Sequence, residues 1–126
     1  MPAREIAAVA AGGAVGAVLR TLGNDWMARA APRFAPAGTL LVNVVGCFAI
    51  GAAMAMLEPR DPRHPLRLIV VTGLLGSLTT FSTFGHQTVE LARGGSPRLA
   101  AANVAANVVV GLLAVVAGDT CGRAFR

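Results

Sequence analysis

Charge is scarce in this chain. Only 13% of its 126 residues are charged, whereas 55% are hydrophobic, and the mean hydropathy is +0.64. A soluble domain of this length needs far more charge on its surface, so the composition is typical of a membrane protein. Nothing in the sequence indicates a second domain, and we expect residues 1–126 to form a single membrane domain.

Lysine is absent, and arginine supplies all the basic side chains behind the net charge of +5. An excess of basic over acidic side chains can indicate nucleic-acid binding. Here, however, the arginines fall mostly in short breaks between apolar runs, where they would contact lipid headgroups. We therefore expect contact with membrane lipid and no nucleic-acid partner.

Cysteine is rare, and no catalytic motif is visible. Cys47 and Cys121 are too few for a disulfide framework, and their spacing matches no metal motif. The sequence contains no Ser-His-Asp arrangement and no glycine-rich phosphate loop. We therefore expect that the protein is not an enzyme.

Carboxylates are missing from the middle of the apolar runs. The acids that border these runs are Glu5, Glu58, Glu90 and Asp119. A small proton-coupled multidrug exporter is the main alternative for so compact a membrane protein, and such an exporter normally needs an acid at membrane depth. The missing acid argues against that alternative.

Four apolar runs are long enough to cross a bilayer, which takes about 20 residues in a helix. They cover residues 5–28, 38–57, 66–92 and 98–118. Clusters of proline and glycine between them indicate short loops. We therefore predict an all-α membrane protein with four transmembrane helices, packed as antiparallel neighbours. In the first run, Gly12 and Gly16 have the spacing that allows close helix packing.

The third run carries a hydroxyl cluster, Thr79-Thr80-Phe81-Ser82-Thr83. Hydroxyls at membrane depth usually face another helix or a polar path. Two glycines just upstream favour a break in this helix, and broken membrane helices occur where the freed backbone has a partner or lines a cavity. The cluster predicts a protein that binds or moves a small polar species within the membrane.

The other polar side chains within the runs are neutral. Neutral donors such as Asn43 suit an anion, because an anion sheds its water only where donors replace it. Phe81 and Phe84 share one helix face, and their ring edges carry partial positive charge that would favour an anion. From spacing alone, ordinary packing is the simpler explanation for these two rings.

The arginines divide almost evenly between the two sides of the membrane. With four spans, the N-terminus, the middle loop and the C-terminus share one side. That side holds Arg4, Arg60, Arg63, Arg67, Arg123 and Arg126, and the other side holds Arg29, Arg33, Arg93 and Arg98, with Arg20 if it extends that way. The positive-inside rule then fixes no orientation. A small count is one explanation; the one we favour is insertion in both orientations, which permits an antiparallel homodimer.

Two motifs stand out in the second and third runs. They read Gly38-Thr39-Leu-Leu-Val-Asn43-Val-Val-Gly46-Cys-Phe48 and Gly73-x-x-Gly76-x-x-Thr79-Thr80-Phe81-Ser82-Thr83-Phe84. With Gly12-Gly13-x-x-Gly16-Ala17-x-x-Arg20 in the first run, they closely resemble the CrcB/Fluc family of fluoride channels. The resemblance covers essentially the whole chain. It implies an antiparallel, dual-topology homodimer with two pores, which exports fluoride passively across the bacterial cytoplasmic (inner) membrane and so lowers fluoride toxicity.

The resemblance also implies roles for residues of the pore. Phe81 and Phe84 would be the aromatic pair beside the fluoride ion, and Asn43 would donate its amide hydrogens to it. Ser82 and Thr83 would belong to a polar track along the pore.

Further roles implied by the resemblance lie around the pore. Gly76 and Thr79 would offer backbone carbonyls to a structural sodium ion at the dimer interface, and Arg20 would raise the positive potential near a vestibule. We expect Gly76 to need unusual backbone angles that a β-branched residue would resist. Two positions depart from the family pattern: Gln87 stands where a glutamate is frequent, and Asn107 stands where a hydroxyl residue is common in the fourth span. We expect Asn107 to belong to the fluoride pore, because its amide can still donate.

Overall fold

The fold consists of long helices joined by short connections. The computed structural model describes residues 1–57 and 61–125, and no strand occurs within these ranges. The first long helix is α1 (Ala3–Ala30) and the second is α2 (Ala37–Leu57). The third contains α3 (Pro65–Arg67), the π-helical η1 (Leu68–Leu75), α4 (Gly76–Leu78) and α5 (Phe81–Arg93). The fourth contains α6 (Pro97–Ala105), the π-helical η2 (Ala106–Val110) and α7 (Gly111–Ala124). Glu58, Pro59, Arg60 and Arg126, which belong to the sequence argument, lie outside the described residues.

All four long helices are apolar enough to cross a membrane, which makes the chain a multi-pass membrane protein. They extend over Ala3–Ala30, Ala37–Leu57, Pro65–Arg93 and Pro97–Ala124. The predicted all-α architecture with a break in the third helix is confirmed. The fourth helix continues past residue 118, because Asp119 pairs with Arg123 one turn later at 2.8 Å and so stays within the helix.

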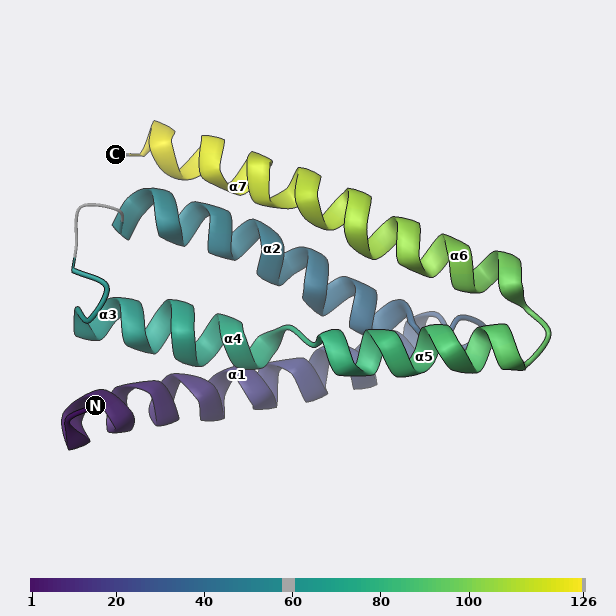
Figure 1. The fold of residues 1–126 in the computed structure, drawn as a ribbon, viewed down its shortest axis with the longest axis horizontal. Coiled ribbons are helices and arrows are strands. Elements are labelled where there is room, and N and C mark those ends of the chain that lie inside the picture. The colour runs from purple at the N-terminus through teal and green to yellow at the C-terminus, as the bar shows by residue number, and fades with distance from the viewer. Residues whose placement is uncertain (58–60, 126) are drawn as a thin grey trace.

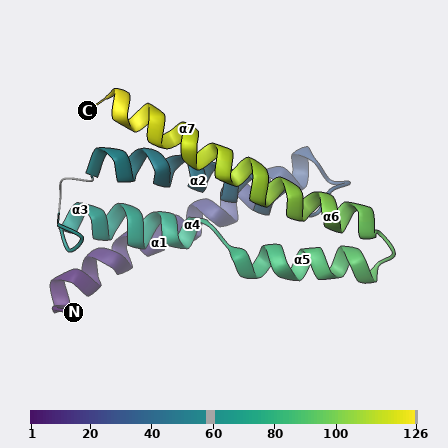
Figure 2. The ribbon, with the colours of Figure 1, turned by 45° about the horizontal axis from the view of Figure 1, so that its top comes forward.

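The third helix divides its contacts between two neighbours (Figures 1 and 2). Its first part, η1 and α4, lies beside α1, whereas its second part, α5, lies beside α6. The second helix, α2, packs along α7. Both chain termini lie at the same end of the molecule, as four spans require (Figure 1).

Glycines bring the backbones of neighbouring helices into contact. A Cβ atom on Gly12 would overlap the carbonyl oxygen of Ile69, and one on Gly16 would overlap that of Leu74. Gly118 of α7 meets the carbonyl oxygen of Phe48 in α2 in the same way. The close packing predicted for the first run is therefore confirmed, with η1 as the partner of α1.

The break in the third helix lies at Thr79 and Thr80, downstream of the glycines. Thr79 has φ −82° and ψ 156°, and Thr80 has φ −151° and ψ 111°, so both are extended. Gly76 has ordinary helical angles, φ −63° and ψ −30°. The expectation that Gly76 needs unusual angles is therefore wrong. Its upstream neighbour Gly73 instead serves helix packing, since a Cβ there would lie 2.6 Å from the Val9 carbonyl oxygen.

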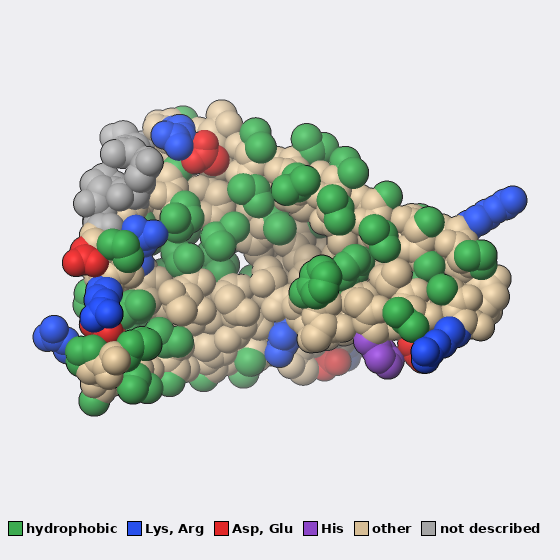
Figure 3. Space-filling model, viewed as in Figure 1, with side chains coloured by type: hydrophobic (Ala, Val, Ile, Leu, Met, Phe, Trp, Pro, Cys, Tyr) green, Lys and Arg blue, Asp and Glu red, His purple; other side chains and the backbone are tan. Residues whose placement is uncertain are grey.

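One face of the molecule is hollowed between α2 and the η1–α4 segment (Figure 3). Hydrophobic side chains cover the middle of this face, and most charged side chains lie toward its two ends. The hollow contains the only place where the third helix turns extended, so it brings freed backbone groups and polar side chains together within the described part of the chain.

Candidate functional site

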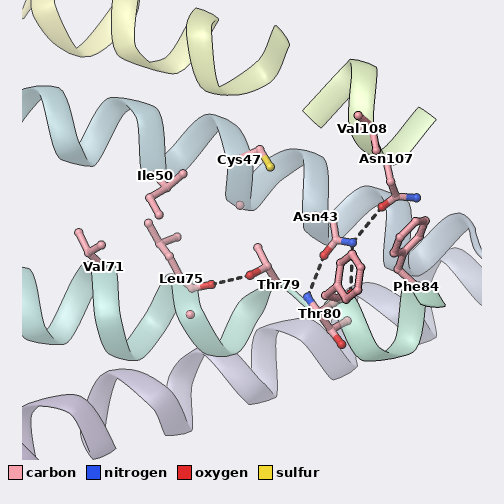
Figure 4. Close-up of a pocket in the computed structure, with 13 residues that line it drawn as sticks. Asn43, Cys47, Ile50, Val71, Leu75, Thr79, Thr80, Phe84, Asn107 and Val108 are labelled. Carbon is pink, nitrogen blue, oxygen red and sulfur yellow. Dashed lines mark hydrogen bonds between the residues drawn. The ribbon is translucent and has the colours of Figure 1, made fainter. Parts of the chain in front are cut away.

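The hollow forms a cavity of about 340 Å³ beside the helix break (Figure 4). It is bounded by α2, by η1 and α4, by the start of α5 and by η2. Its lining residues are Asn43, Gly46, Cys47, Ile50, Val71, Leu75, Gly76, Thr79, Thr80, Phe81, Phe84, Asn107 and Val108. None of these is charged, so the cavity is apolar along most of its wall and has neutral polar groups at one end.

Asn43 holds the break in place. Its Oδ1 accepts a hydrogen bond from the backbone N–H of Thr80 at 2.8 Å. Its Nδ2 donates to Asn107 Oδ1 at 2.9 Å and makes a longer contact of 3.4 Å with the Thr80 carbonyl oxygen. A single side chain of α2 thus replaces a helical hydrogen bond that the third helix has lost.

The break takes the carbonyl oxygens of Gly76 and Thr79 away from their α-helical donors. In a continuous α-helix, the N–H of Thr80 would bond the carbonyl of Gly76, and the N–H of Thr83 would bond that of Thr79. Here the first N–H donates to Asn43 Oδ1 and the second donates to Thr80 Oγ1 at 3.2 Å. The two carbonyls assigned to sodium by resemblance are therefore among those whose helical donors are diverted.

Carbonyl oxygens suit a hard cation such as sodium. No cluster of three or more His, Cys, Asp or Glu side chains able to hold a metal ion occurs in residues 1–57 and 61–125. The residues that the resemblance assigns to sodium would offer backbone oxygens, which are a kind of ligand that suits this ion.

The aromatic pair meets at the mouth of the cavity. The ring centroids of Phe81 and Phe84 are 5.3 Å apart and the ring planes are inclined by 60°. Phe84 is 8% exposed and packs inside the chain, but Phe81 is 82% exposed. Packing within one chain therefore accounts for Phe84 and does not account for Phe81.

The hydroxyl groups that follow the break contact one another. Thr80 Oγ1 donates to Thr83 Oγ1 at 3.0 Å and lies 3.2 Å from Ser82 Oγ. Ser82 is exposed, and Thr83 is half-buried. Sequence reasoning did not single out Thr80, although it caps α5 and lies at the centre of this cluster.

A second cavity, of about 360 Å³, lies one helical turn beyond the first. Thr83 lines it, together with Thr39 of α2 and Gln87 of α5. Thr39 is 1% exposed, and Thr39 Oγ1 and Gln87 Oε1 have no hydrogen-bond partner among the described residues. Buried polar atoms without partners are rare in folded proteins, and here they mark a place for water or another small polar species.

Thr39 and Asn43 are one turn apart on α2, and Thr83 and Gln87 are one turn apart on α5. On α2 these two side chains line the second and the first cavity in turn, whereas both α5 side chains line the second. The spacing of Thr39 from Asn43 was a signal in the sequence, because residues four apart share a helix face.

Asn107 of the fourth helix reaches the first cavity and contacts Asn43 (Figure 4). Its own Nδ2 donates to the backbone oxygen of Asn103 at 3.0 Å and to Asn103 Oδ1 at 3.1 Å. Asn103 is 1% exposed and is among the most deeply buried side chains of the described chain. Sequence reasoning missed this residue as part of the site.

Arg20 stands apart from this cluster. It is half-buried on α1 and is not among the residues that line the two cavities. Its assignment to a vestibule stays a prediction, as do the ion contacts of the residues that the structure gathers around the break.

Comparison with known proteins places the chain in a family. The family model described as "CrcB-like protein, Camphor Resistance (CrcB)" matches residues 7–119. A protein of Chloroflexus aurantiacus named fluoride-specific ion channel FluC is 40% identical over 121 residues, which are 95% of this chain and 96% of the relative. Proteins of the same name from Agrobacterium fabrum and Pseudomonas putida are each 45% identical over 120 residues, covering 94% of this chain and 95% and 96% of those relatives. The chain belongs to the CrcB family.

Proposed function

We propose that the protein is a fluoride-selective channel that lets fluoride leave the cell passively. The observation that carries this proposal is the meeting of neutral donors and an aromatic pair at a helix break, in a chain 40–45% identical to proteins named fluoride-specific channels. An inside-negative potential expels an anion with about 2.3 kcal/mol per charge per 100 mV. Export of this kind lowers the toxicity of fluoride trapped inside the cell.

Passive conduction fits the chemistry of the cavity better than coupled export. No Asp or Glu is among the residues that line the first cavity, and the acid that lines the second, Asp25, lies in the last two turns of α1. The site at the helix break therefore offers no proton carrier for a multidrug exporter. The relatives named above are channels rather than enzymes or exporters. The protein accordingly performs no covalent chemistry.

The working unit that we propose is an inverted homodimer. Phe81 is 82% exposed, and the first cavity opens onto the face seen in Figure 3. A desolvated fluoride ion beside lipid would lack donors on that side, which is costly in hydrocarbon. A second copy laid against this face would enclose the ion, and the nearly even arginine distribution favours a copy of opposite orientation in the bacterial cytoplasmic (inner) membrane.

The freed carbonyls of Gly76 and Thr79 would bind a structural sodium ion where the two copies meet. Support comes from the diversion of their helical donors to Asn43 and Thr80, which leaves two backbone oxygens for a hard cation. The ion would hold the two breaks together; it takes no part in moving fluoride.

Fluoride efflux from liposomes that contain the purified protein tests the function. Vesicles loaded with potassium fluoride should release fluoride through the wild-type protein once a potassium ionophore is added, because potassium then leaves with the anion and no opposing membrane potential builds up. Vesicles loaded with chloride should release far less. Asn43→Leu serves as the matched variant, because it keeps the side-chain volume and removes both polar atoms. Fluoride release no faster than from empty vesicles, with assembled protein present, contradicts the proposal.

A further inference from the structure

A chain of side-chain hydrogen bonds runs from the first cavity into the space between α5 and the fourth helix. Asn43 Nδ2 donates to Asn107 Oδ1 at 2.9 Å, and Asn107 Nδ2 donates to Asn103 Oδ1 at 3.1 Å. Asn103 Nδ2 donates to Thr88 Oγ1 at 2.9 Å. Thr88 Oγ1 donates to the backbone oxygen of Phe84 at 2.8 Å. The bonds therefore all point in one direction, from Asn43 to Phe84.

The far end of this chain fixes the direction of its bonds. The carbonyl oxygen of Phe84 can only accept, so the hydroxyl of Thr88 donates to it and accepts from Asn103. Asn103 must then turn its Nδ2 to Thr88 and its Oδ1 to Asn107. The Asn103 side chain and its backbone oxygen both accept from the Asn107 amide nitrogen.

The near end fixes the same direction independently. The Oδ1 of Asn43 accepts from the backbone N–H of Thr80, which can only donate. Asn43 must then turn its Nδ2 toward Asn107, which presents its carbonyl oxygen. The orientations of the three amides thus follow from hydrogen-bond chemistry, and Asn107 shows an acceptor, not a donor, to the cavity.

This arrangement makes Asn107 a competitor for the donor of Asn43. An anion that binds the Asn43 Nδ2 hydrogen facing the fourth helix must displace the carbonyl oxygen of Asn107. Chloride is larger than fluoride, so it must push that oxygen further from Asn43 and strain more of the bonds that hold Asn107. The displacement therefore costs chloride more. Asn103 is 1% exposed, so no water is at hand to replace it as the group that holds Asn107.

We propose that Asn103 is a positioning residue for ion selectivity: it holds the Asn107 carbonyl oxygen against Asn43, so that a larger anion displaces that oxygen at a greater cost. This inference rests on the proposed fluoride-channel function and names a determinant of its selectivity. Asn103 itself does not contact the ion. Its effect passes entirely through Asn107.

The test compares fluoride and chloride efflux from liposomes for the wild type, Asn103→Leu, Asn107→Ala and the double variant. Asn103→Leu leaves Asn107 one hydrogen bond, to the backbone, in place of two. We expect the fluoride-to-chloride ratio of efflux rates to fall by about two- to tenfold, which is the range one hydrogen bond spans. In the Asn107→Ala background, adding Asn103→Leu should change the ratio no further, because the residue through which it acts is gone.

A second pair of variants tests the same chain of hydrogen bonds if Asn103→Leu does not fold. Thr88→Val removes the hydroxyl that anchors Asn103, and Thr88→Ser keeps it. We expect Thr88→Val to lower the ratio and Thr88→Ser to retain it. Thr120→Val is the matched control: the Thr120 hydroxyl also bonds a backbone oxygen one turn earlier, that of Val116 at 2.9 Å, but lies in α7 away from the cavity. Its ratio should equal that of the wild type.

Three results would overturn the inference. The first is an unchanged ratio in assembled Asn103→Leu or, where that variant does not assemble, in Thr88→Val. The second is an equal fall in the ratio when Asn103→Leu is added to Asn107→Ala, which would mean that Asn103 acts by another route. The third is a wild type that releases no fluoride, which overturns the proposed function and this inference with it; the first two leave the proposed function standing.

Discussion

At the scale of single residues, the two phenylalanines differ more than their shared helix face suggested. Phe84 is buried among helices of its own chain, whereas Phe81 projects from it with 82% of its surface exposed. Their rings nevertheless lie together, with centroids 5.3 Å apart and planes inclined by 60°. A ring edge turned toward an anion offers it weak positive charge without holding it tightly.

Phe81→Ile and Phe84→Ile should each cut the initial rate of fluoride efflux at least tenfold, on the order of one lost interaction worth 1.4 kcal/mol. Apolar volume is roughly kept, so we expect Phe84→Ile to cost less than about 1.5 kcal/mol of stability and Phe81→Ile to cost less still. The measurement is efflux per assembled protein. Phe48→Ile on α2, whose side chain does not line the first cavity, is the control. Wild-type rates in both variants would return the pair to ordinary packing.

At the scale of elements, hydropathy sufficed to place four helices, because each run is apolar for longer than a bilayer is thick. It could not locate the break. The break was expected at Gly76 and Thr79. Thr79 is extended, but its partner in the break is Thr80 and Gly76 stays helical, because Asn43 of another helix supplies the hydrogen bond that Thr80 has lost. A partner so distant in sequence leaves no trace in local composition.

The candidate site could be predicted only in part, because some of its residues also leave no local pattern in the sequence. Resemblance singled out Asn43, Phe81, Phe84 and Asn107, and the fold brings all four to one cavity. Asn103 was overlooked, because a buried amide in an apolar helix has no local pattern that separates it from a helix-packing residue. The π-helical turns η1 and η2 also left no mark, since a change in hydrogen-bond register does not alter hydropathy.

Close packing of α1 on η1 predicts which glycines tolerate a side chain. Gly16→Val should destabilise the protein by about 1–3 kcal/mol, because its Cβ would overlap the backbone oxygen of Leu74 and backbone cannot move aside cheaply. Gly85→Ala is the control, since a Cβ there meets no atom within 4 Å in the same chain. Thermal unfolding in detergent measures the difference. Equal melting temperatures for the two variants would contradict the packing argument.

At the scale of the whole molecule, the charge distribution bears on insertion. Arginines lie near both ends of the helices, and no side collects a clear excess. Reporter fusions at the C-terminus should therefore reveal two populations, one cytoplasmic and one external. Adding arginines to the loop between α2 and α3 should shift the populations toward one orientation. A single orientation for the unaltered chain would refute dual insertion.

Sodium should stabilise the assembled pair and not the isolated chain. Replacing sodium with N-methylglucamine during purification should lower the melting temperature of the dimer and increase the monomer fraction, because repulsion between the freed carbonyl oxygens is then uncompensated. Size-exclusion chromatography with light scattering measures the fractions. Restoring sodium should reverse the change and lithium or caesium should do so less well. A dimer indifferent to these ions would argue against the proposed site.

The broken helix also has an electrical polarity. The aligned peptide dipoles of α5 place roughly half a positive charge at its start, beside Phe81, while the end of α4 carries a negative counterpart. One interruption thus attracts an anion to one rim and a cation to the other. In an inverted pair the two interruptions point in opposite directions across the bilayer, so their fields along the membrane normal cancel. The pair should then pass fluoride equally well in either direction, with a current–voltage curve that is symmetric about zero.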